Sequence, residues 1–110
     1  MISKAIKVRR GRRLRFITIY EIKSIRSGRV YIGSSKDTFM RWNQHLYGII
    51  MNTHSNKELI EEYKLYGISN FTFRILRLLP VGEDIRKIEQ SFLNKFISKE
   101  LFNKRKSYKG

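Results

Sequence analysis

The sequence predicts an α+β fold, in which a small, mostly antiparallel sheet of three strands is flanked by three helices. Three runs rich in β-branched and aromatic residues indicate the strands. Apolar residues that recur at helical spacing after capping residues indicate the helices. The chain has 110 residues, 41% of them hydrophobic, which suits one small domain with a single modest core.

The first two strands form a predicted β-hairpin. Residues 16–22 and 29–33 have the composition of strands, and a polar segment with serine and glycine lies between them. A four-residue turn over 24–27 would place Tyr20 directly opposite Tyr31, so that both phenols share one face of the sheet. A turn one residue longer would put the two rings on opposite faces. A turn with an even number of residues therefore predicts a tyrosine pair on one surface.

A first helix is predicted over residues 37–50, after a polar run that can cap its start. Its core face is expected to contain Phe39, Trp42, Leu46, Ile49 and Ile50. Arg41 and His45 lie four residues apart, so they share one polar face of this helix. By themselves, an arginine and a histidine on such a face are more often simply solvated. His54, the other histidine, is interpreted as an ordinary residue of the following loop.

The second half of the chain supplies the other three elements. Residues 55–58 fit a capping box and open a second helix that ends at Gly67. The apolar positions of that helix are Leu59, Ile60, Tyr63 and Tyr66. Residues 71–78 largely alternate as a third strand does, and Pro80 stops it. A third helix opens at residues 82–84, where acidic side chains favour the positive end of a helix.

One acidic residue falls on the inward side of this third helix. The inward stripe is Ile85, Ile88, Phe92, Leu93, Phe96 and Ile97, with Lys95 and Lys99 near the end of the helix. Glu89 lies four residues after Ile85 and three before Phe92, so it belongs to the same side. A carboxylate there is costly unless it is paired or bound to a cation. A salt bridge to one of the many arginines and a metal site both remain open.

The charge of the chain is strongly positive. Twenty-four lysines and arginines against nine acidic residues give a formal net charge of +15. Such an excess favours a nucleic-acid partner, through neutralisation of phosphates and release of counterions. The residues expected to contact it are Arg9, Arg10, Arg12, Arg13, Lys36, Lys104, Arg105 and Lys106. Charge alone does not separate a nuclease from a basic RNA-binding protein.

Several classes of protein are excluded or disfavoured. The chain has no cysteine, which excludes disulfides and thiolate metal sites. No apolar run approaches the roughly 18 residues that a membrane span needs. The first residues lack the apolar core of a secretory signal, so a cytoplasmic or other intracellular setting is expected.

Short motifs in the first half of the chain resemble the signature of the GIY-YIG nuclease superfamily. They are Ile19-Tyr20, Tyr31-Ile32-Gly33-Ser34-Ser35, Arg41-Trp42 and His45. The resemblance extends over residues 16–103, with Glu89-Gln90-Ser91-Phe92-Leu93 similar to the family's metal-binding helix and Leu101-Phe102-Asn103 similar to its closing motif. Thr18 stands where the first family motif has glycine. Threonine is a favourable residue in a strand, so this difference does not affect the predicted fold. Its side chain could, however, crowd the substrate.

The resemblance implies a metal-dependent DNA endonuclease that hydrolyses phosphodiester bonds. Tyr20 would be the general base or would position the attacking water, and His45 would accept or relay its proton. Positive neighbours are expected to make the phenolate of Tyr20 more accessible. Tyr31 would orient water or contact the scissile phosphate, and the planar guanidinium of Arg41 would stabilise the transition state.

The resemblance also implies one divalent ion per active site, Mg²⁺ or Mn²⁺, held by Glu89. Asn103 would buttress the site through hydrogen bonds. The expected organisation is a basic arm over 1–14, a nuclease domain over 15–103 and a basic tail over 104–110. No second carboxylate accompanies Glu89 in the sequence pattern, which argues against a two-metal nuclease.

Two alternatives stay open at this point. The chain is either the catalytic part of a homing-endonuclease-like protein or a small freestanding nuclease of a phage or mobile element. A non-catalytic nucleic-acid-binding module on the same scaffold is the rival from another functional class. Double-stranded DNA is the expected substrate, and the sequence defines neither the sequence specificity nor the oligomeric state.

Overall fold

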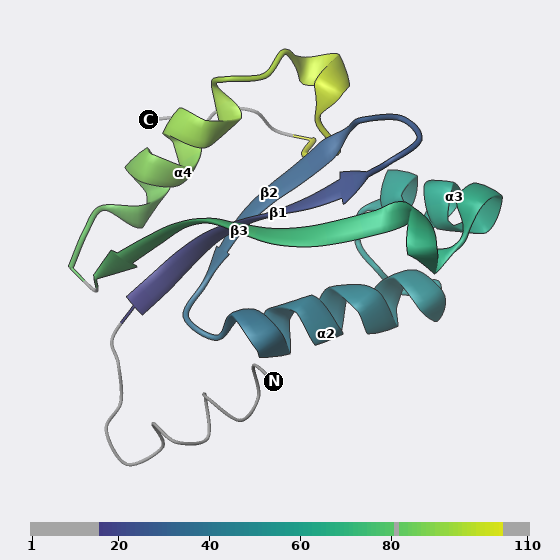
Figure 1. The fold of residues 1–110 in the computed structure, drawn as a ribbon, viewed down its shortest axis with the longest axis horizontal. Coiled ribbons are helices and arrows are strands. Elements are labelled where there is room, and N and C mark those ends of the chain that lie inside the picture. Colours follow the sequence, from purple (N-terminus) through teal and green to yellow (C-terminus); the bar gives the residue numbers. More distant parts are fainter. Residues whose placement is uncertain (1–15, 81, 105–110) are drawn as a thin grey trace.

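A computed structural model describes residues 16–80 and 82–104. Its elements are β1 (Phe16–Ser24), β2 (Val30–Ser35), α2 (Thr38–Ile50), α3 (Lys57–Tyr66), β3 (Phe71–Pro80) and α4 (Ile85–Leu93), with short 3-10 helices at Ile68–Asn70 and Ser98–Glu100 (Figure 1). The predicted basic arm over 1–14 lies outside the described residues, as do residues 105–110 of the predicted tail. Three strands and three α-helices within the described ranges confirm the predicted α+β fold.

The three strands form one antiparallel sheet in the order β2-β1-β3, so β1 is the central strand. A segment near the described C-terminal end adds to the outer edge of β2. Leu101 forms a parallel bridge with Val30, and the amide of Phe102 donates to the carbonyl of Val30 at 2.7 Å. The edge of β2 is therefore covered by this segment, whereas β3 forms the opposite edge of the sheet.

The register of the hairpin differs from the prediction. Tyr20 lies opposite Gly33, and Tyr31 lies opposite Ile22, so the predicted direct pairing of the two tyrosines is wrong. The turn spans residues 24–29 and is two residues longer than expected. It is closed by hydrogen bonds from the amide of Ser24 to the carbonyl of Arg29 and from the amide of Gly28 to the carbonyl of Ser24. A shift of two residues preserves the face of every side chain. The two phenols therefore share one face, as predicted, but lie diagonally.

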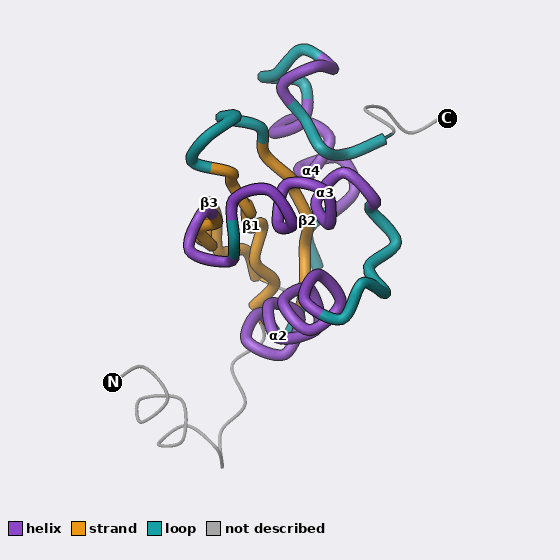
Figure 2. Tube along the Cα trace, turned by 90° about the vertical axis from the view of Figure 1, so that its right-hand side faces the viewer, coloured by secondary structure: helices purple, strands orange, loops and turns teal. Residues whose placement is uncertain are grey.

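Helices cover both faces of the sheet. On one face, α4 packs over a core of Ile19, Val30, Ile32, Leu79, Leu93 and Leu101. On the other face, α2 and α3 pack over Tyr20, Ile22, Ile49, Leu59, Phe71 and Phe102. Figure 1 shows α4 and α2 on opposite sides of the strands, and the view in Figure 2, turned by 90°, shows α2 running along one side of them. Tyr20 therefore belongs to the core of the α2 face.

The α2 helix begins as predicted, because the side chain of its N-cap residue Asp37 accepts a hydrogen bond from the amide of Met40. Of the expected core face, Ile49 is buried and Trp42 and Leu46 are half-buried, whereas Phe39 and Ile50 are 38% and 45% exposed. His45 is buried beside Ile49. The helix thus turns a histidine toward the sheet. His45 is therefore buried and is not one of the simply solvated histidines that such a face more often carries.

Three element boundaries also differ from the prediction. The N-cap of α3 is Asn56, whose side chain accepts hydrogen bonds from the backbone amides of Glu58 and Leu59. β3 continues to Pro80, which pairs with Phe16 at the end of the sheet. α4 ends at Leu93, earlier than expected, because the chain must turn back to place Leu101 on the edge of β2. Within the described ranges, no helix combines the length and apolarity that crossing a membrane requires.

Candidate active site

A pocket of about 420 Å³ is lined by residues of β1, β2, α2 and α4, of the loop before α3 and of the segment after α4. Five of the six predicted catalytic residues line it: Tyr20, Tyr31, Arg41, Glu89 and Asn103. The sixth, His45, lines a neighbouring hollow that shares Tyr31 and Arg41 with this pocket, and it contacts Tyr20. Residues that span more than eighty positions of the chain thus meet at one place.

Tyr20 enters this pocket from the sheet through the space that Gly33 leaves. The tyrosine is only 1% exposed and lies opposite Gly33 in the ladder. A Cβ atom on Gly33 would lie 2.5 Å from the phenol oxygen and 2.6 Å from the ring carbon that bears it. The glycine is required for space, because any side chain there would push the phenol out of the site.

Beside the pocket, His45 connects Tyr20 to a second histidine. The phenol oxygen of Tyr20 lies 2.8 Å from Nε2 of His45. Nδ1 of His45 lies 2.7 Å from Nε2 of His54, and the two imidazole rings meet edge to edge, with their planes inclined by 24° and their centroids 5.0 Å apart. The interpretation of His54 as an ordinary loop residue is therefore wrong. The available signal was that the chain has only two histidines, separated by a short loop.

Tyr31 and Arg41 face the pocket from two different elements. The ring of Tyr31 on β2 is half-buried and meets the ring of His45 edge-on, with centroids 5.2 Å apart. Arg41 is exposed and stands one helical turn before His45 on α2. A guanidinium in this position can offer two parallel donors to a phosphate.

Glu89 reaches the pocket from α4. The Oγ of Ser34 on β2 donates a hydrogen bond to its carboxylate at 2.8 Å, a contact that the sequence analysis missed. The described residues contain no cluster of three or more histidine, cysteine or acidic side chains around a possible metal position. A half-buried carboxylate facing an open pocket fits a single hard cation that keeps most of its water ligands.

Asn103 holds the outer wall of the pocket against β2. Its Oδ1 accepts a hydrogen bond from the amide of Ile32 at 2.9 Å, and its Nδ2 donates to the carbonyl of Ile32 at 3.0 Å. The side chain thus pairs with the strand edge as a backbone peptide would. This geometry supports the buttressing role that was expected for Asn103.

Burial dominates the titration of the pocket side chains. It raises the pKa of Tyr20, the neighbouring Tyr31 adds to the rise, and the positive charge of Arg41 opposes it. Burial also raises the pKa of Tyr31. It lowers the pKa of His45 to about 4, with smaller contributions from His54 and Arg41. The expected easing of Tyr20 deprotonation by positive neighbours is thus outweighed by desolvation.

These shifts predict that acid destabilises the folded protein between about pH 6.5 and pH 4. The unfolded chain binds a proton at His45 near pH 6.5, whereas the folded protein resists it down to about pH 4. The unfolded state therefore binds more protons in this window, and stability falls as the pH falls. The loss amounts to roughly 3 kcal/mol for a shift of this size.

Urea denaturation at a series of pH values measures this effect as the change in the free energy of unfolding. His45→Gln should give a flatter dependence, although the lowered pKa of His54 leaves part of the slope in place. A slope identical to that of the parent protein would contradict the assignment to His45.

Comparison with known proteins identifies the family. The chain matches the family model of the GIY-YIG catalytic domain over residues 16–106. The chain belongs to the GIY-YIG family. In one solved structure, a mutant of the catalytic domain of the intron endonuclease I-TevI, 27% of aligned residues are identical and the TM-score is 0.73, over 86% of this chain and 99% of that chain. A second structure of the I-TevI catalytic domain gives 28% identity and a TM-score of 0.65, over 72% of this chain and 86% of that one.

Two curated GIY-YIG relatives match a similar stretch. Intron-associated endonuclease 1 of Enterobacteria phage T4 is 29% identical over 83 residues, which are 76% of this chain and 34% of that protein. Probable intron-encoded endonuclease 1 of Neurospora crassa is 31% identical over 91 residues, 77% of this chain and 29% of that protein. The chain thus spans about a third of the length of these relatives.

The threonine in the first GIY-YIG motif does not enter the pocket. Thr18 is 7% exposed, and its hydroxyl bonds to the carbonyl of Ser35 and to the hydroxyl of Thr38 at the start of α2. Its side chain therefore ties β1 to the end of β2 and to α2. The crowding that the sequence analysis considered does not arise from this side chain.

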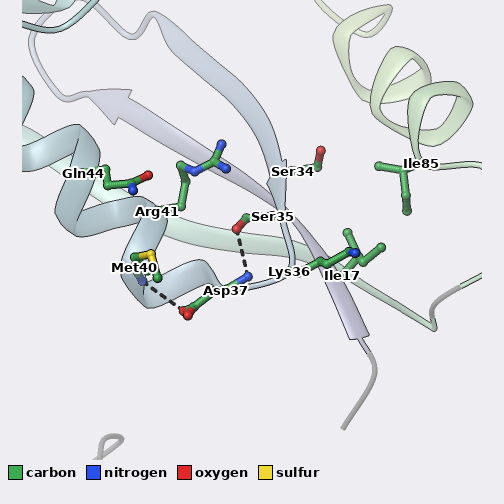
Figure 3. A pocket seen from close by; sticks show the side chains of 9 residues that line it. All are labelled: Ile17, Ser34, Ser35, Lys36, Asp37, Met40, Arg41, Gln44 and Ile85. Atoms are coloured by element: carbon green, nitrogen blue, oxygen red, sulfur yellow. Dashed lines mark hydrogen bonds between the residues drawn. The ribbon is translucent and has the colours of Figure 1, made fainter. Parts of the chain in front are cut away.

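A second hollow of about 470 Å³ adjoins the GIY-YIG pocket and shares Ser34 and Arg41 with it. Figure 3 shows its wall, with Arg41 and Gln44 on one side, Ile85 on the other and Lys36 between them. At the first pocket, the lining includes the exposed residue Lys104. Each hollow is thus lined by Arg41 and by one further basic side chain, Lys36 in one and Lys104 in the other. The other predicted nucleic-acid contacts, Arg9, Arg10, Arg12, Arg13, Arg105 and Lys106, lie outside the described residues.

Proposed function

We propose that this GIY-YIG domain is a metal-dependent endonuclease that hydrolyses phosphodiester bonds in double-stranded DNA. The observation that carries the proposal is the meeting of Tyr20, Tyr31, Arg41, His45, Glu89 and Asn103 in one site. The names of the relatives support the reaction class, since both are called endonucleases. The net charge of +15 supports a nucleic-acid substrate. A homing-endonuclease-like protein or a small phage or mobile-element nuclease is the expected biological type.

The pocket supplies the groups that phosphodiester hydrolysis needs. Tyr20 positions the attacking water and, as the phenolate that has lost its own proton to solvent in the pocket, takes a proton from that water as the bond to phosphorus forms. Tyr31 orients the same water or the phosphate. The guanidinium of Arg41 binds the non-bridging phosphate oxygens, on which negative charge grows in the transition state. Asn103 keeps the wall of the pocket in place through Ile32.

Glu89 is the residue that would hold the divalent ion, Mg²⁺ or Mn²⁺, one per active site. The ion supplies Lewis-acid stabilisation of the leaving 3′ oxygen when it is bound. Ser34 orients the carboxylate through its hydrogen bond, so that the carboxylate faces the pocket from α4. The fit of a divalent ion to this pocket rests on the carboxylate of Glu89, which shares the pocket with the guanidinium of Arg41.

The test is nicking of supercoiled plasmid by the purified protein. We expect nicked circles with Mg²⁺ or Mn²⁺, and intact plasmid with EDTA. Arg41→Lys keeps the charge but loses the planar fork, so it should bind DNA nearly as well and cut much more slowly. Salt-sensitive binding without nicking under any divalent ion would overturn the proposal and favour a non-catalytic binding module on this scaffold.

A further inference from the structure

A continuous chain of hydrogen bonds runs from a backbone amide to the active-site tyrosine. The amide nitrogen of Asn56 lies 2.9 Å from Nδ1 of His54. Nε2 of His54 lies 2.7 Å from Nδ1 of His45, and Nε2 of His45 lies 2.8 Å from the phenol oxygen of Tyr20. Every link joins two atoms that can each donate or accept, except the first, where the direction is set.

The direction of the first bond determines the others. A backbone N–H can only donate, so Nδ1 of His54 must be the unprotonated acceptor. A neutral imidazole carries one proton, so that proton is on Nε2 of His54 and is donated to Nδ1 of His45. Nδ1 of His45 is then an acceptor, and the proton of His45 is on Nε2. The last bond therefore runs from His45 to the oxygen of Tyr20.

This order of donors requires both rings to be neutral, and their surroundings favour this. Burial lowers the pKa of both histidines, and the charge of Arg41 opposes a cation at His45. The hydrogen bond between the rings would also bring two cations together. Among the described residues, the titratable side chains in contact with the pair or acting on its charge are Tyr20, Tyr31 and Arg41, and none of these is a carboxylate that would stabilise a charged imidazole.

We propose that His54, oriented by the amide of Asn56, holds His45 in the Nε2–H tautomer, so that His45 donates to Tyr20 and does not take its proton. The phenol proton of Tyr20 then points toward the pocket and leaves to solvent there, and the resulting phenolate is stabilised by the N–H of His45. His54 is a positioning residue. Its mechanistic meaning rests on the proposed nuclease function, whereas the tautomer is a property of the folded protein alone.

The loop that carries His54 is built to hold this geometry. The amides of Thr53 and His54 both donate to the carbonyl of Gly48, at 2.8 and 3.0 Å. A Cβ atom on Gly48 would lie 3.2 Å from the Cα of His54, so the glycine permits this close approach. Asn56 is fixed in turn, because its side chain caps α3 and donates to the carbonyl of Phe102 at 2.8 Å. The hydrogen-bond chain from Asn56 to Tyr20 is thereby anchored to α2, to α3 and to the C-terminal segment.

The direct test is the ¹⁵N NMR spectrum of the two imidazoles in the intact protein near pH 7. Long-range proton–nitrogen correlations distinguish a protonated from an unprotonated ring nitrogen. We expect both His45 and His54 to show the Nε2–H pattern. An Nδ1–H pattern or an averaged mixture at His45 would overturn the proposal, whether or not the protein cuts DNA.

Two substitutions of His54 then test the role in catalysis. His54→Ala removes the donor to His45, so His45 should become a tautomer mixture and cleavage should fall between roughly 10-fold and 10⁴-fold. His54→Gln can place an amide N–H near the same position, and it should restore the Nε2–H pattern and much of the activity. Melting temperature controls for folding of both variants.

The outcomes separate the proposed tautomer of His45 from the proposed nuclease function. An alanine variant that keeps the Nε2–H pattern and full cleavage would show that His54 does not position His45. If the parent protein shows the expected tautomers but never nicks DNA, the proposed tautomer of His45 is supported and the proposed function fails. If the parent protein nicks DNA with His45 in the other tautomer, the proposed function is supported and the proposed role of His54 fails.

Discussion

Glu89→Gln is expected to abolish DNA cleavage while leaving DNA binding and thermal stability close to those of the parent protein. Glutamine keeps the size of the side chain and an oxygen that can still accept the hydrogen bond from Ser34. It removes the negative charge that attracts a divalent ion. Since a carboxylate near phosphate also repels it, DNA affinity should hold or rise slightly.

The competing role of Glu89, a structural ion pair, makes a different prediction. Breaking a buried pair leaves an uncompensated charge and typically costs about 3–5 kcal/mol. Nicking assays and thermal melting, each with and without Mg²⁺, read both roles at once. Glu83→Gln is a matched control, because it removes the same charge from an exposed residue just before α4. A Glu89→Gln protein that melts much earlier but still nicks plasmid would remove the metal-ligand assignment.

Tyr20→Phe should have the second large effect, lowering cleavage by roughly 10²-fold or more. The ring keeps its place against Gly33, but the group that positions water and takes its proton is gone. The structure adds a cost in stability that the sequence did not predict. The hydroxyl is the 2.8 Å partner of a buried ring nitrogen of His45, and leaving that nitrogen without a partner costs about 1–3 kcal/mol.

Single-turnover cleavage and thermal melting measure these two effects separately. A loss of about 1 kcal/mol lowers the melting temperature of a domain of this size by roughly 4–8 °C. Tyr63→Phe serves as the control, because it deletes the same hydroxyl from a ring packed on α3 in the same core. Cleavage at the parental rate by Tyr20→Phe would show that Tyr20 is not the base, and another group would have to activate the water.

Local spacing predicted the faces of the hairpin but not its register. Alternation assigns a side chain to one side of a sheet, and this assignment survives any shift by two residues. The length of the turn depends on the bond from the amide of Ser24 to the carbonyl of Arg29, on the bond from the amide of Gly28 to the carbonyl of Ser24, and on the positive φ of Gly28, at 77°. Such closures are decided by the whole turn. Tyr20 and Tyr31 therefore came out on the predicted face with the wrong partners.

The α2 helix shows a similar limit. Its apolar residues predicted a core face, but the helix packs with His45 and Ile49 inward and leaves Phe39 partly exposed. Apolar spacing identifies a stripe that can be buried, whereas the neighbouring elements decide which arc is covered. At His45 the neighbours include two polar partners, the hydroxyl of Tyr20 and the ring of His54. A histidine bonded to Tyr20 and His54 can therefore be buried in preference to an aromatic side chain.

The sequence by itself determined the α+β class and the basic charge, because these follow from local periodicity and residue type. Its short motifs carried the resemblance to the GIY-YIG family, and that resemblance pointed to six residues that the fold brings to one site. The tertiary structure alone decided the pairing of His54 with His45, of Ser34 with Glu89 and of Asn103 with Ile32, whose members lie 9, 55 and 71 residues apart. The reason is physical: a hydrogen-bond partner is chosen by the packing of elements, and local spacing carries no record of it.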